Sequence, residues 1–314
     1  MLTAYGLNEF PPGGESVLAL GTFDGLHLGH QRVIGEATAQ ARSIGGRSVV
    51  VTFDPHPLEV LRPSPEPTLL TTIEERLPLL AALGVEVAVV LPFDLEFSQT
   101  RAQVWLDEIL AARLRAREIF VGPSYTFGFR REGTVLALAE WGRAHGVGVH
   151  LVPAVLVSGE PVSSSRVRSA LREGLVDEAT RLLGRTYSLG GRVVPGSGRG
   201  RGLGYPTANL EVPSRKILPG RGVYATIAEI GGRRYGGATN VGVRPTFAER
   251  ALRVETHVLD YHGDLVGEAM TLHFVQRIRA ERAFPGPEAL VRQIGEDVAQ
   301  VRQLLATAGP GIIR

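Results

Sequence analysis

Two periods of hydrophobic residues alternate along the first half of the chain. Short, mainly apolar runs predict strands that are buried on both faces of a parallel sheet. These runs are residues 17–20, 48–53, 85–91, 117–122 and 147–157, the last broken by Pro153. Between them, apolar residues at helical spacing predict helices at residues 33–44, 71–83, 100–114 and 132–145. The alternation predicts a doubly wound α/β domain, whose ligands bind at the carboxyl ends of its strands.

Two of these helices begin with a capping pattern. Thr71 or Thr72 is followed after three residues by glutamate, which is the signature of a capping box. Thr100 is followed by Gln103 in the same way. We therefore expect threonine N-caps at the starts of both helices.

The pattern changes after residue 162. Residues 163–184 predict two short helices that end at Gly184, a helix stop signal. We expect the boundary between two domains directly after it, with the first domain at residues 1–185 and the second at residues 186–314.

Strand patterns dominate the second domain. The Gly231-Gly232 pair separates residues 223–230 from residues 233–241 and predicts a tight hairpin. Residues 252–260 and 268–275 are interpreted as a second pair of strands. Antiparallel strands of this kind close into a small barrel or a sandwich. An amphipathic helix at residues 287–305 is expected to cover the open side of the barrel.

Composition narrows the class of protein without indicating a chemistry. The 314 residues are 44% hydrophobic, which suits two domains with cores of their own. The net charge of +2 does not require nucleic acid or an anionic membrane as a partner. The absence of cysteine excludes disulfides, thiolates and cysteine-ligated metals. Because no basic leader or long apolar stretch occurs, we expect a cytoplasmic protein, and we leave self-association open.

The strongest candidate site is the stretch GTFDGLHLGH at residues 21–30. It joins a strand run to a helical pattern, so His27 and His30 lie at or just before a helix N-terminus. Backbone N–H groups, the helix dipole and two imidazoles favour phosphate there, and Gly25 and Gly29 would let it approach closely. Two alternatives stay open. One is a turn that needs its glycines for geometry alone, and the other is a zinc site that would need a third ligand.

Residues 163–168, SSSRVR, form a second candidate. Three serines precede a helix start, and Arg166 and Arg168 fall in its first turn. The helix dipole disfavours cations there unless an anion binds between them, although serine caps need no function of their own. If both candidates face one ligand, they form a triphosphate clamp.

The third candidate is GSGRGRGLGYPTAN at residues 196–209, and it matches neither the dinucleotide fingerprint nor the P-loop. Its glycines with Arg199 and Arg201 can still wrap phosphates, and Thr207 and Asn209 supply oxygens suited to Mg²⁺. A flexible loop without a ligand is the alternative. Glu255 is the fourth candidate, and a lone glutamate on a strand is as easily a solvated surface residue.

Taken together, these motifs resemble the bacterial bifunctional riboflavin kinase/FMN adenylyltransferases, often called FAD synthetases, almost end to end. The segments that carry the resemblance are GTFDGLHLGH, VVVTFDPHP at 49–57, FVG…FG at 120–128, SSSRVR, LLGR at 182–185, GRGRGLGYPTAN at 198–209, GVYA at 222–225, NVGVRPTF at 240–247 and VET at 254–256. Many nucleotidyltransferases share the HxGH pattern within the first segment, whereas PTAN followed by NVGVRPTF and VE is specific for flavokinases.

The resemblance implies a Rossmann-like nucleotidyltransferase domain followed by a small antiparallel β-barrel with a C-terminal helix. It implies that the barrel phosphorylates riboflavin to FMN and that the first domain adenylylates FMN to FAD, with Mg²⁺ and ATP at each step and pyrophosphate released. In the first domain, the expected catalytic residues are His27, His30, Arg166 and Arg168. The other contacts expected there are Gly21, Phe23, Asp24, Gly25, Gly29, Ser124, Phe127, Ser164 and Ser165.

In the barrel, the resemblance makes Glu255 the catalytic base and Thr207 and Asn209 the ligands of Mg-ATP. The further contacts expected there are Gly196, Arg199, Gly200, Arg201, Gly204, Pro206, Asn240 and Arg244. The chain departs from the family pattern at Ser124, Ser165, Pro195, Gly198 and Val266. Two rival functions stay open: adenylyl transfer alone, because the kinase loop is altered, and a nucleotide- or RNA-binding regulator without turnover.

Overall fold

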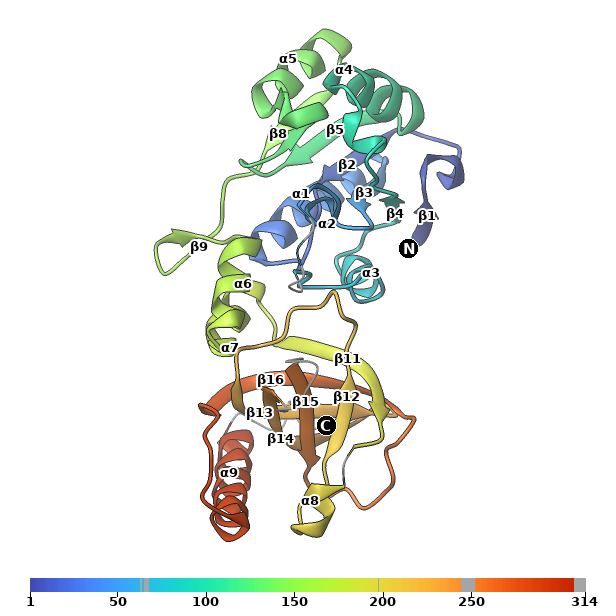
Figure 1. The fold of residues 1–314 in the computed structure, drawn as a ribbon. Helices are drawn as coiled ribbons and strands as arrows, with labels where there is room; N and C mark the ends of the chain where they lie inside the picture. Colours follow the sequence, from blue (N-terminus) through green and yellow to red (C-terminus); the bar gives the residue numbers. More distant parts are fainter. Residues whose placement is uncertain (63, 65–67, 197, 244–251, 308–314) are drawn as a thin grey trace. The chain divides into compact units, whose positions relative to one another are not determined.

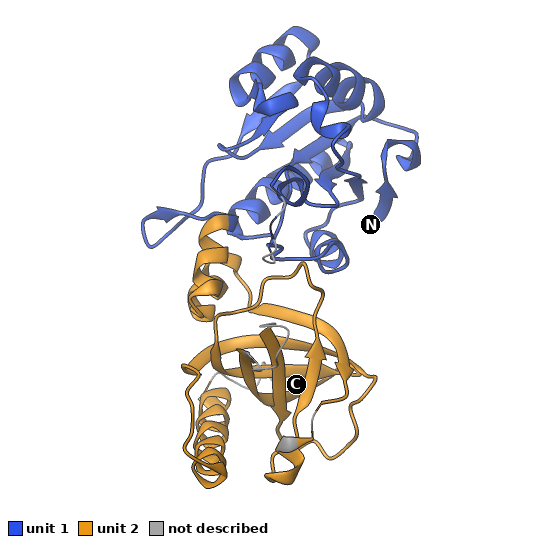
Figure 2. Ribbon diagram, in the orientation of Figure 1, with its two compact units in different colours: residues 1–164 blue, residues 165–314 orange. Residues whose placement is uncertain are grey.

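The computed structural model describes all residues except 63, 65–67, 197, 244–251 and 308–314. It divides into two compact units, Met1–Ser164 and Ser165–Arg314 (Figure 2). Each unit has buried hydrophobic clusters of its own. Among the residues that the structure describes, no helix has the length and apolar character needed to cross a membrane.

A six-stranded parallel sheet is the centre of the first unit, with strand order β1-β4-β3-β2-β5-β8 (Figure 1). The strands are β1 Leu2–Tyr5, β2 Ser16–Leu20, β3 Arg47–Phe53, β4 Val87–Leu91, β5 Ala116–Val121 and β8 Gly148–Leu151. Every residue of β2 and β4 is buried, as expected for strands covered on both faces. Because β3 and β5 flank β2 on opposite sides, the topological switch point lies at the carboxyl end of β2.

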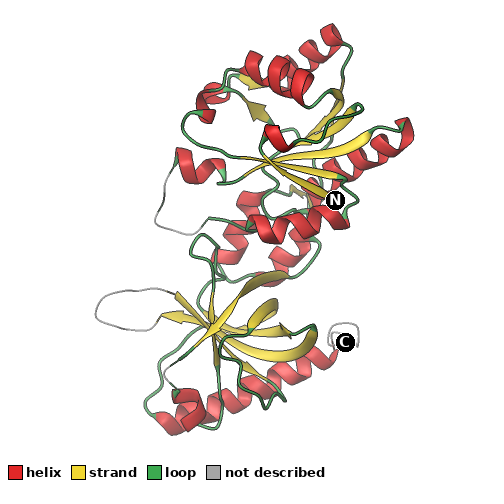
Figure 3. Ribbon diagram, turned by 90° about the vertical axis from the view of Figure 1, so that its right-hand side faces the viewer, coloured by secondary structure: helices red, strands yellow, loops and turns green. Residues whose placement is uncertain are grey.

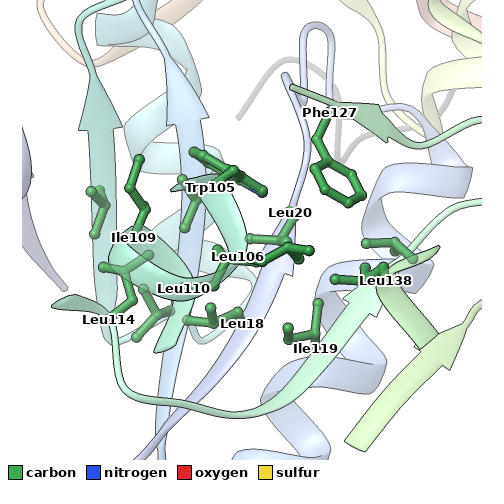
Figure 4. Close-up of a cluster of buried hydrophobic side chains, with 14 of the residues drawn as sticks. Leu18, Leu20, Trp105, Leu106, Ile109, Leu110, Leu114, Ile119, Phe127 and Leu138 are labelled. Atoms are coloured by element: carbon green, nitrogen blue, oxygen red, sulfur yellow. The ribbon is translucent and has the colours of Figure 1, made fainter. Parts of the chain in front are cut away.

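Helices cover both faces of this sheet, which confirms the doubly wound α/β prediction. One face packs against α1, Leu28–Ile44, and α3, Ile73–Ala82. The other packs against η3, Trp105–Arg113, and α5, Val135–His145. Figure 4 shows the second contact, where Leu18 and Leu20 of β2 lie among Trp105, Leu106 and Leu110. The shorter elements are η1 Leu7–Glu9, α2 Pro57–Leu61, η2 Phe97–Gln99, α4 Ala102–Val104, β6 Thr126–Phe127, η4 Phe129–Arg131, β7 Gly133–Thr134, β9 Leu156–Val157 and β10 Glu160–Pro161.

The two predicted threonine caps have different outcomes. Thr72 caps α3 in a capping box with Glu75, as predicted. The prediction for Thr100 is wrong, because the helix begins after Arg101, whose side chain makes no cap, and α4 is followed by the π-helical η3. The Ala102 N–H donates instead to Glu132 Oε1 at 2.7 Å, so a carboxylate distant in the sequence takes the capping role.

A closed antiparallel barrel forms the second unit, with strand order β11-β12-β15-β14-β13-β16 (Figure 1, Figure 3). Its strands are β11 Tyr187–Val194, β12 Ala208–Glu211, β13 Gly222–Ile230, β14 Arg233–Val243, β15 Leu252–Val258 and β16 Ala269–Arg279. Its helices are α7 Val176–Leu183, α8 Arg199–Gly202, α9 Pro287–Thr307 and all but the first residue of α6 Ser164–Arg172. The predicted hairpin is confirmed: Gly231 and Gly232 join β13 to β14 with φ of 55° and 76°.

Two expectations for the barrel are wrong. The strands predicted at residues 252–260 and 268–275 both form, but β15 pairs with β12 and β14 while β16 pairs with β11 and β13. The helix α9 does not fill an opening, because the ring of hydrogen-bonded strands is already closed. Val301 and Leu305 of α9 instead pack on Ala225 and Ile227 of β13, so the helix covers an apolar outer face.

Candidate active sites

The loop between β2 and α1 carries both predicted histidines. His27 is the N-cap of α1, and its Nδ1 accepts a hydrogen bond from the His30 N–H at 3.3 Å. Their rings stack with centroids 3.6 Å apart and an angle of 20° between the planes. The histidines therefore lie at a helix N-terminus at the carboxyl end of β2, which is the placement that favours an anion.

Asp24 and Gly25 shape this loop through contacts within the protein. The buried Asp24 carboxylate accepts hydrogen bonds from the N–H groups of Leu70, at 3.0 Å, and Thr71, at 2.9 Å. Gly25 has a φ of 82°, its N–H donates to Thr71 Oγ1, and a Cβ atom there would lie 2.7 Å from Leu70 Cδ1. Backbone geometry and packing thus explain both residues without a ligand.

The rings of His27, His30 and Phe23 pack closely together and against the backbone at Gly21 and Gly29. Phe23 is buried, and its ring meets His30 edge-on with centroids 5.2 Å apart. A Cβ atom at Gly21 would lie 3.1 Å from the Phe23 ring, and one at Gly29 would lie 3.1 Å from His27 Cε1. The two glycines therefore allow aromatic side chains to lie close to the backbone.

The serine-arginine motif divides between the two units. Ser164 belongs to the first unit, where its hydroxyl donates to the Asp24 carbonyl at 3.0 Å. Ser165, Arg166 and Arg168 belong to the second, where Ser165 is exposed and Arg168 is buried. The Arg166 guanidinium pairs with Glu178 of α7 at 2.6 Å. A joint phosphate clamp of these arginines with the histidines stays a prediction.

An aromatic cavity of about 560 Å³ opens beside this loop, and the sequence reasoning identified only part of it. Two of the expected contacts, Phe127 and Gly21, line the cavity, whereas a third, Ser124, is exposed and lies outside the described lining. The other aromatic side chains of the lining are Phe53, Phe93, Phe97, Trp105, Tyr125 and Phe129. Burial raises the pKa of the Tyr125 phenol, although its hydrogen bond with Trp105 acts in the opposite direction. Five of the eleven phenylalanines of the chain meet here from separate segments, a grouping that no single stretch of the sequence reveals.

Three polar residues lie side by side on neighbouring strands of the barrel. Glu255 of β15 is opposite Asn209 of β12 on one side and opposite Asn240 of β14 on the other. Residues directly opposite on antiparallel strands place their side chains on the same face, with Cβ atoms about 5 Å apart. Glu255 and Asn240 are half-buried, and Asn209 is 9% exposed. The register thus places a carboxylate between two amides, and the roles of the three residues stay predictions.

The glycine-rich loop forms the wall of a second cavity, of about 250 Å³. Gly196, Arg201, Pro206 and Thr207 line it, and so do three positions that depart from the family pattern, namely Pro195, Gly198 and Val266. The loop packs tightly, because a Cβ atom at Gly200 would lie 2.4 Å from the Tyr205 carbonyl oxygen. Gly204 has a φ of 82°. Arg244 and the Arg199 side chain lie outside the described residues.

Asn209 lies against this loop, and its side-chain oxygen is buried without a described hydrogen-bond partner. A Cβ atom at Gly196 would lie 2.1 Å from Asn209 Nδ2, so only glycine fits there. Asn209 Oδ1 is buried and has no hydrogen-bond partner among the described residues. A buried amide oxygen without a partner is unfavourable by itself, which points to a ligand that completes it.

Family models match both halves of the chain. A model described as FAD synthetase matches residues 12–166, and one described as riboflavin kinase matches residues 183–305. Together they include the histidine loop, the aromatic cavity and the three polar residues of the barrel.

Relatives with the name bifunctional riboflavin kinase/FMN adenylyltransferase match along most of the chain. The protein from Listeria monocytogenes is 36% identical over 93% of this chain and 93% of its own length. Those from Bacillus subtilis and Escherichia coli K12 are 37% and 33% identical, over 90% and 98% of this chain and 90% and 97% of their own lengths. A crystal structure from Streptococcus pneumoniae, titled as a macrolide-efflux protein, has a TM-score of 0.87 at 32% identity and covers 96% of this chain and 98% of its own. The chain therefore belongs to the bifunctional riboflavin kinase/FMN adenylyltransferase family.

Proposed function

We propose that this protein makes FMN and then FAD at two separate sites. The barrel phosphorylates riboflavin with ATP, and the α/β domain transfers the adenylyl group of ATP to FMN. The register of Asn209, Glu255 and Asn240 beside the glycine loop carries the kinase assignment. We assign residues 1–185 to the adenylyltransferase and residues 186–314 to the kinase, which the matches at 12–166 and 183–305 support.

Adenylyl transfer requires positioning and positive charge more than a base. The phosphate of FMN is largely ionised near pH 7, because the second pKa of a phosphate monoester is about 6. One of its oxygens attacks the α-phosphorus of ATP, a new P–O bond forms, and the bond to the β-phosphate oxygen breaks to release pyrophosphate. We propose that His27, His30, Ser164, Ser165, Arg166 and Arg168 bind the triphosphate and stabilise the charge that develops on it.

The aromatic cavity is our proposed site for the flavin ring of FMN. Its volume of about 560 Å³ and its aromatic walls suit a flat ring system with two apolar faces. Gly21 lines the cavity and also belongs to the histidine loop, so a flavin bound there would have its phosphate arm close to the histidines. Asp24, Gly25, Phe23 and Gly29 would contribute by shaping the loop.

Riboflavin phosphorylation does require a base, because the nucleophile is a neutral alcohol with a high pKa. We propose that the Glu255 carboxylate accepts the proton of the ribityl 5′-hydroxyl. The hydroxyl oxygen then bonds to the γ-phosphorus of ATP, and the bond between this phosphorus and the β-phosphate oxygen breaks to release ADP. Asn209 and Asn240 flank Glu255 and can orient it by hydrogen bonds. The loop residues Gly196, Arg199, Gly200, Arg201, Gly204 and Pro206, with Arg244, would enclose the phosphates.

The residues present in the barrel fit a magnesium ion. The buried Asn209 Oδ1 lacks a partner among the described residues, and Thr207 lines the adjacent cavity with a hydroxyl, so two hard oxygens are available. Among the described residues, no group of three or more His, Asp or Glu side chains could hold a metal ion, so phosphate and water oxygens would complete the coordination. Bound there, the ion would neutralise charge on the phosphates of ATP.

We place both activities in the cytoplasm, where ATP is available. A product assay tests them. Purified protein is incubated with riboflavin and Mg-ATP, and the flavins are separated over time. We expect FMN to rise first and FAD to follow. Supplied FMN with Mg-ATP should give FAD and pyrophosphate directly. If neither flavin forms, the proposal is wrong, and if FAD forms only from supplied FMN, the adenylyl-transfer rival replaces it.

A further inference from the structure

A buried arginine in the first unit has no role in the mechanism above. Arg76, on α3, is 2% exposed and is not part of the described lining of the aromatic cavity. Its Nη1 donates to Thr52 Oγ1 at 3.0 Å and to the Phe53 carbonyl at 3.3 Å, and its Nη2 donates to the Thr71 carbonyl at 3.2 Å. The planar guanidinium therefore joins the end of β3 to the start of α3 with a fixed geometry.

The same arginine reaches the histidine loop. Its Nη2 lies 3.8 Å from Oδ1 of the fully buried Asp24. Thr52 Oγ1, which accepts from Arg76, donates in turn to the Thr22 carbonyl at 2.8 Å. Asp24 and Thr22 both lie in the turn that leads to His27 and His30. Three segments that are distant in sequence are thus joined at one buried charge.

Because this ion pair is buried, it is stable only if its hydrogen-bond partners are accurately placed. A charge buried in a low-dielectric interior is tolerated only when its partners are well placed, and removal of one partner is strongly unfavourable. The pair contacts both proposed parts of the first site, the aromatic cavity and the histidine loop. Arg76 donates to the carbonyl of Phe53, which lines the cavity, and Asp24 precedes the helix cap at His27. A displacement of about 1 Å in reacting groups can lower a rate about a hundredfold.

We propose that Arg76 is a positioning residue for adenylyl transfer. It holds the turn before the two histidines and the Phe53 wall of the flavin cavity in one relative arrangement, so that the FMN phosphate meets the α-phosphorus of ATP. This inference rests on the proposed function of the first site. Arg76 itself touches neither substrate, and its effect passes through Thr52, Thr71 and Asp24.

Two variants separate positioning from mere stabilisation. Arg76→Lys keeps a positive charge beside Asp24, but a single ammonium group cannot reproduce the fork between Thr52, Phe53 and Thr71. Thr52→Val is nearly isosteric and removes only the hydroxyl between Arg76 and Thr22. The matched control is Thr72→Ala, which removes the N-cap of the same helix and leaves all contacts of Arg76 in place.

The assay measures kcat and KM for FAD formation from FMN and ATP, with thermal unfolding of each variant and its riboflavin kinase rate as internal references. We expect Arg76→Lys to lower kcat for adenylyl transfer about tenfold or more, and Thr52→Val about threefold to tenfold, while KM for ATP changes less than about threefold. The kinase rate stays at the wild-type level in both. Thr72→Ala lowers the unfolding temperature but not kcat.

The inference is overturned if Arg76→Lys or Thr52→Val transfers adenylyl groups at the wild-type rate, or if Thr72→Ala lowers kcat as much as Thr52→Val does. If Arg76→Lys fails to fold, the comparison of Thr52→Val with Thr72→Ala decides alone. If the wild-type chain makes no FAD from FMN, the proposed function of the first site fails instead.

Discussion

Replacement of Glu255 by glutamine tests the kinase mechanism most directly. Glutamine keeps the volume and most of the hydrogen-bonding capacity of the side chain, so Asn209 and Asn240 retain their neighbour on the barrel face. The change removes one negative charge and the ability to accept a proton. We therefore expect Glu255→Gln to fold normally and to bind riboflavin and ATP.

The size of the effect follows from the surroundings of Glu255. No ion pair joins Glu255 to a described residue, and its neighbours in register are neutral amides, so its charge is available to the substrate hydroxyl. A positioned general base contributes about 10² to 10⁴ to a rate. We expect kcat for riboflavin phosphorylation to fall about 10³-fold, which corresponds to about 4 kcal/mol of transition-state stabilisation.

The assay follows FMN formation from riboflavin and Mg-ATP, with FAD formation from supplied FMN as the reference on the same preparation. The control is Glu211→Gln, which removes an exposed carboxylate two residues from Asn209 on β12. We expect the control to keep its kinase rate and both variants to keep adenylyl transfer. If Glu255→Gln retains more than about a third of kcat, a base at this position is refuted, since even weak general bases contribute about 10²-fold.

Three further changes give separate expectations. In His30→Ala, FAD formation from supplied FMN should fall about 10²-fold while riboflavin phosphorylation continues, because a stabilising group is lost from one site only. Asp297→Ala should lower the free energy of unfolding by about 3 kcal/mol in urea denaturation, because the buried Asp297 holds Arg279 through three hydrogen bonds. Burial lowers the pKa of His273 from its usual 6.5, although the charge of Glu229 acts in the opposite direction. The folded barrel therefore binds a proton at His273 less readily than the unfolded chain does. As a result, the folded state loses stability as the pH falls below 6.5. His273→Gln should make urea midpoints measured at pH 7.5 and 5.5 more nearly equal.

Controls and contrary results define each of these tests. If His30→Ala is folded but has lost both activities, the two sites are not independent. Asp260→Ala breaks an exposed ion pair with Arg302 and should scarcely change the urea midpoint. An equal effect of Asp297→Ala and Asp260→Ala would contradict the assigned role of burial. An unchanged pH dependence in His273→Gln would show that other groups cause the loss of stability.

Local patterns in the sequence predict much of this fold. The strands β2, β3 and β4 and the helices α1 and α3 form where hydrophobic period and capping residues agree, and the Gly231-Gly232 hairpin follows from the backbone freedom of glycine. Non-local partners account for the failures. The cap at Ala102 comes from Glu132, and the pairing of β15 and β16 with other strands depends on barrel closure, which no short window contains.

In the candidate sites, too, local features can be predicted from the sequence and features with distant partners cannot. The motifs point to the histidine loop and the glycine loop, because each is a run of chemistry-bearing residues in one segment. Glu255 is a lone glutamate, and only the family resemblance assigns it a role. The motifs do not reveal that Asp24 serves the protein itself, since its partners Leu70 and Thr71 lie more than forty positions away. The aromatic cavity was missed because its walls come from separate segments, and each phenylalanine alone is indistinguishable from a core residue.

The cap at the start of α1 also fixes where a proton can reside. Because His27 Nδ1 accepts the His30 N–H, that nitrogen must keep its lone pair, and a neutral His27 carries its hydrogen on Nε2. Nitrogen chemical shifts of the imidazole would report this tautomer. The His30 ring stacks on this imidazole and restricts its rotation. The loop therefore makes His27 a hydrogen-bond donor of fixed orientation.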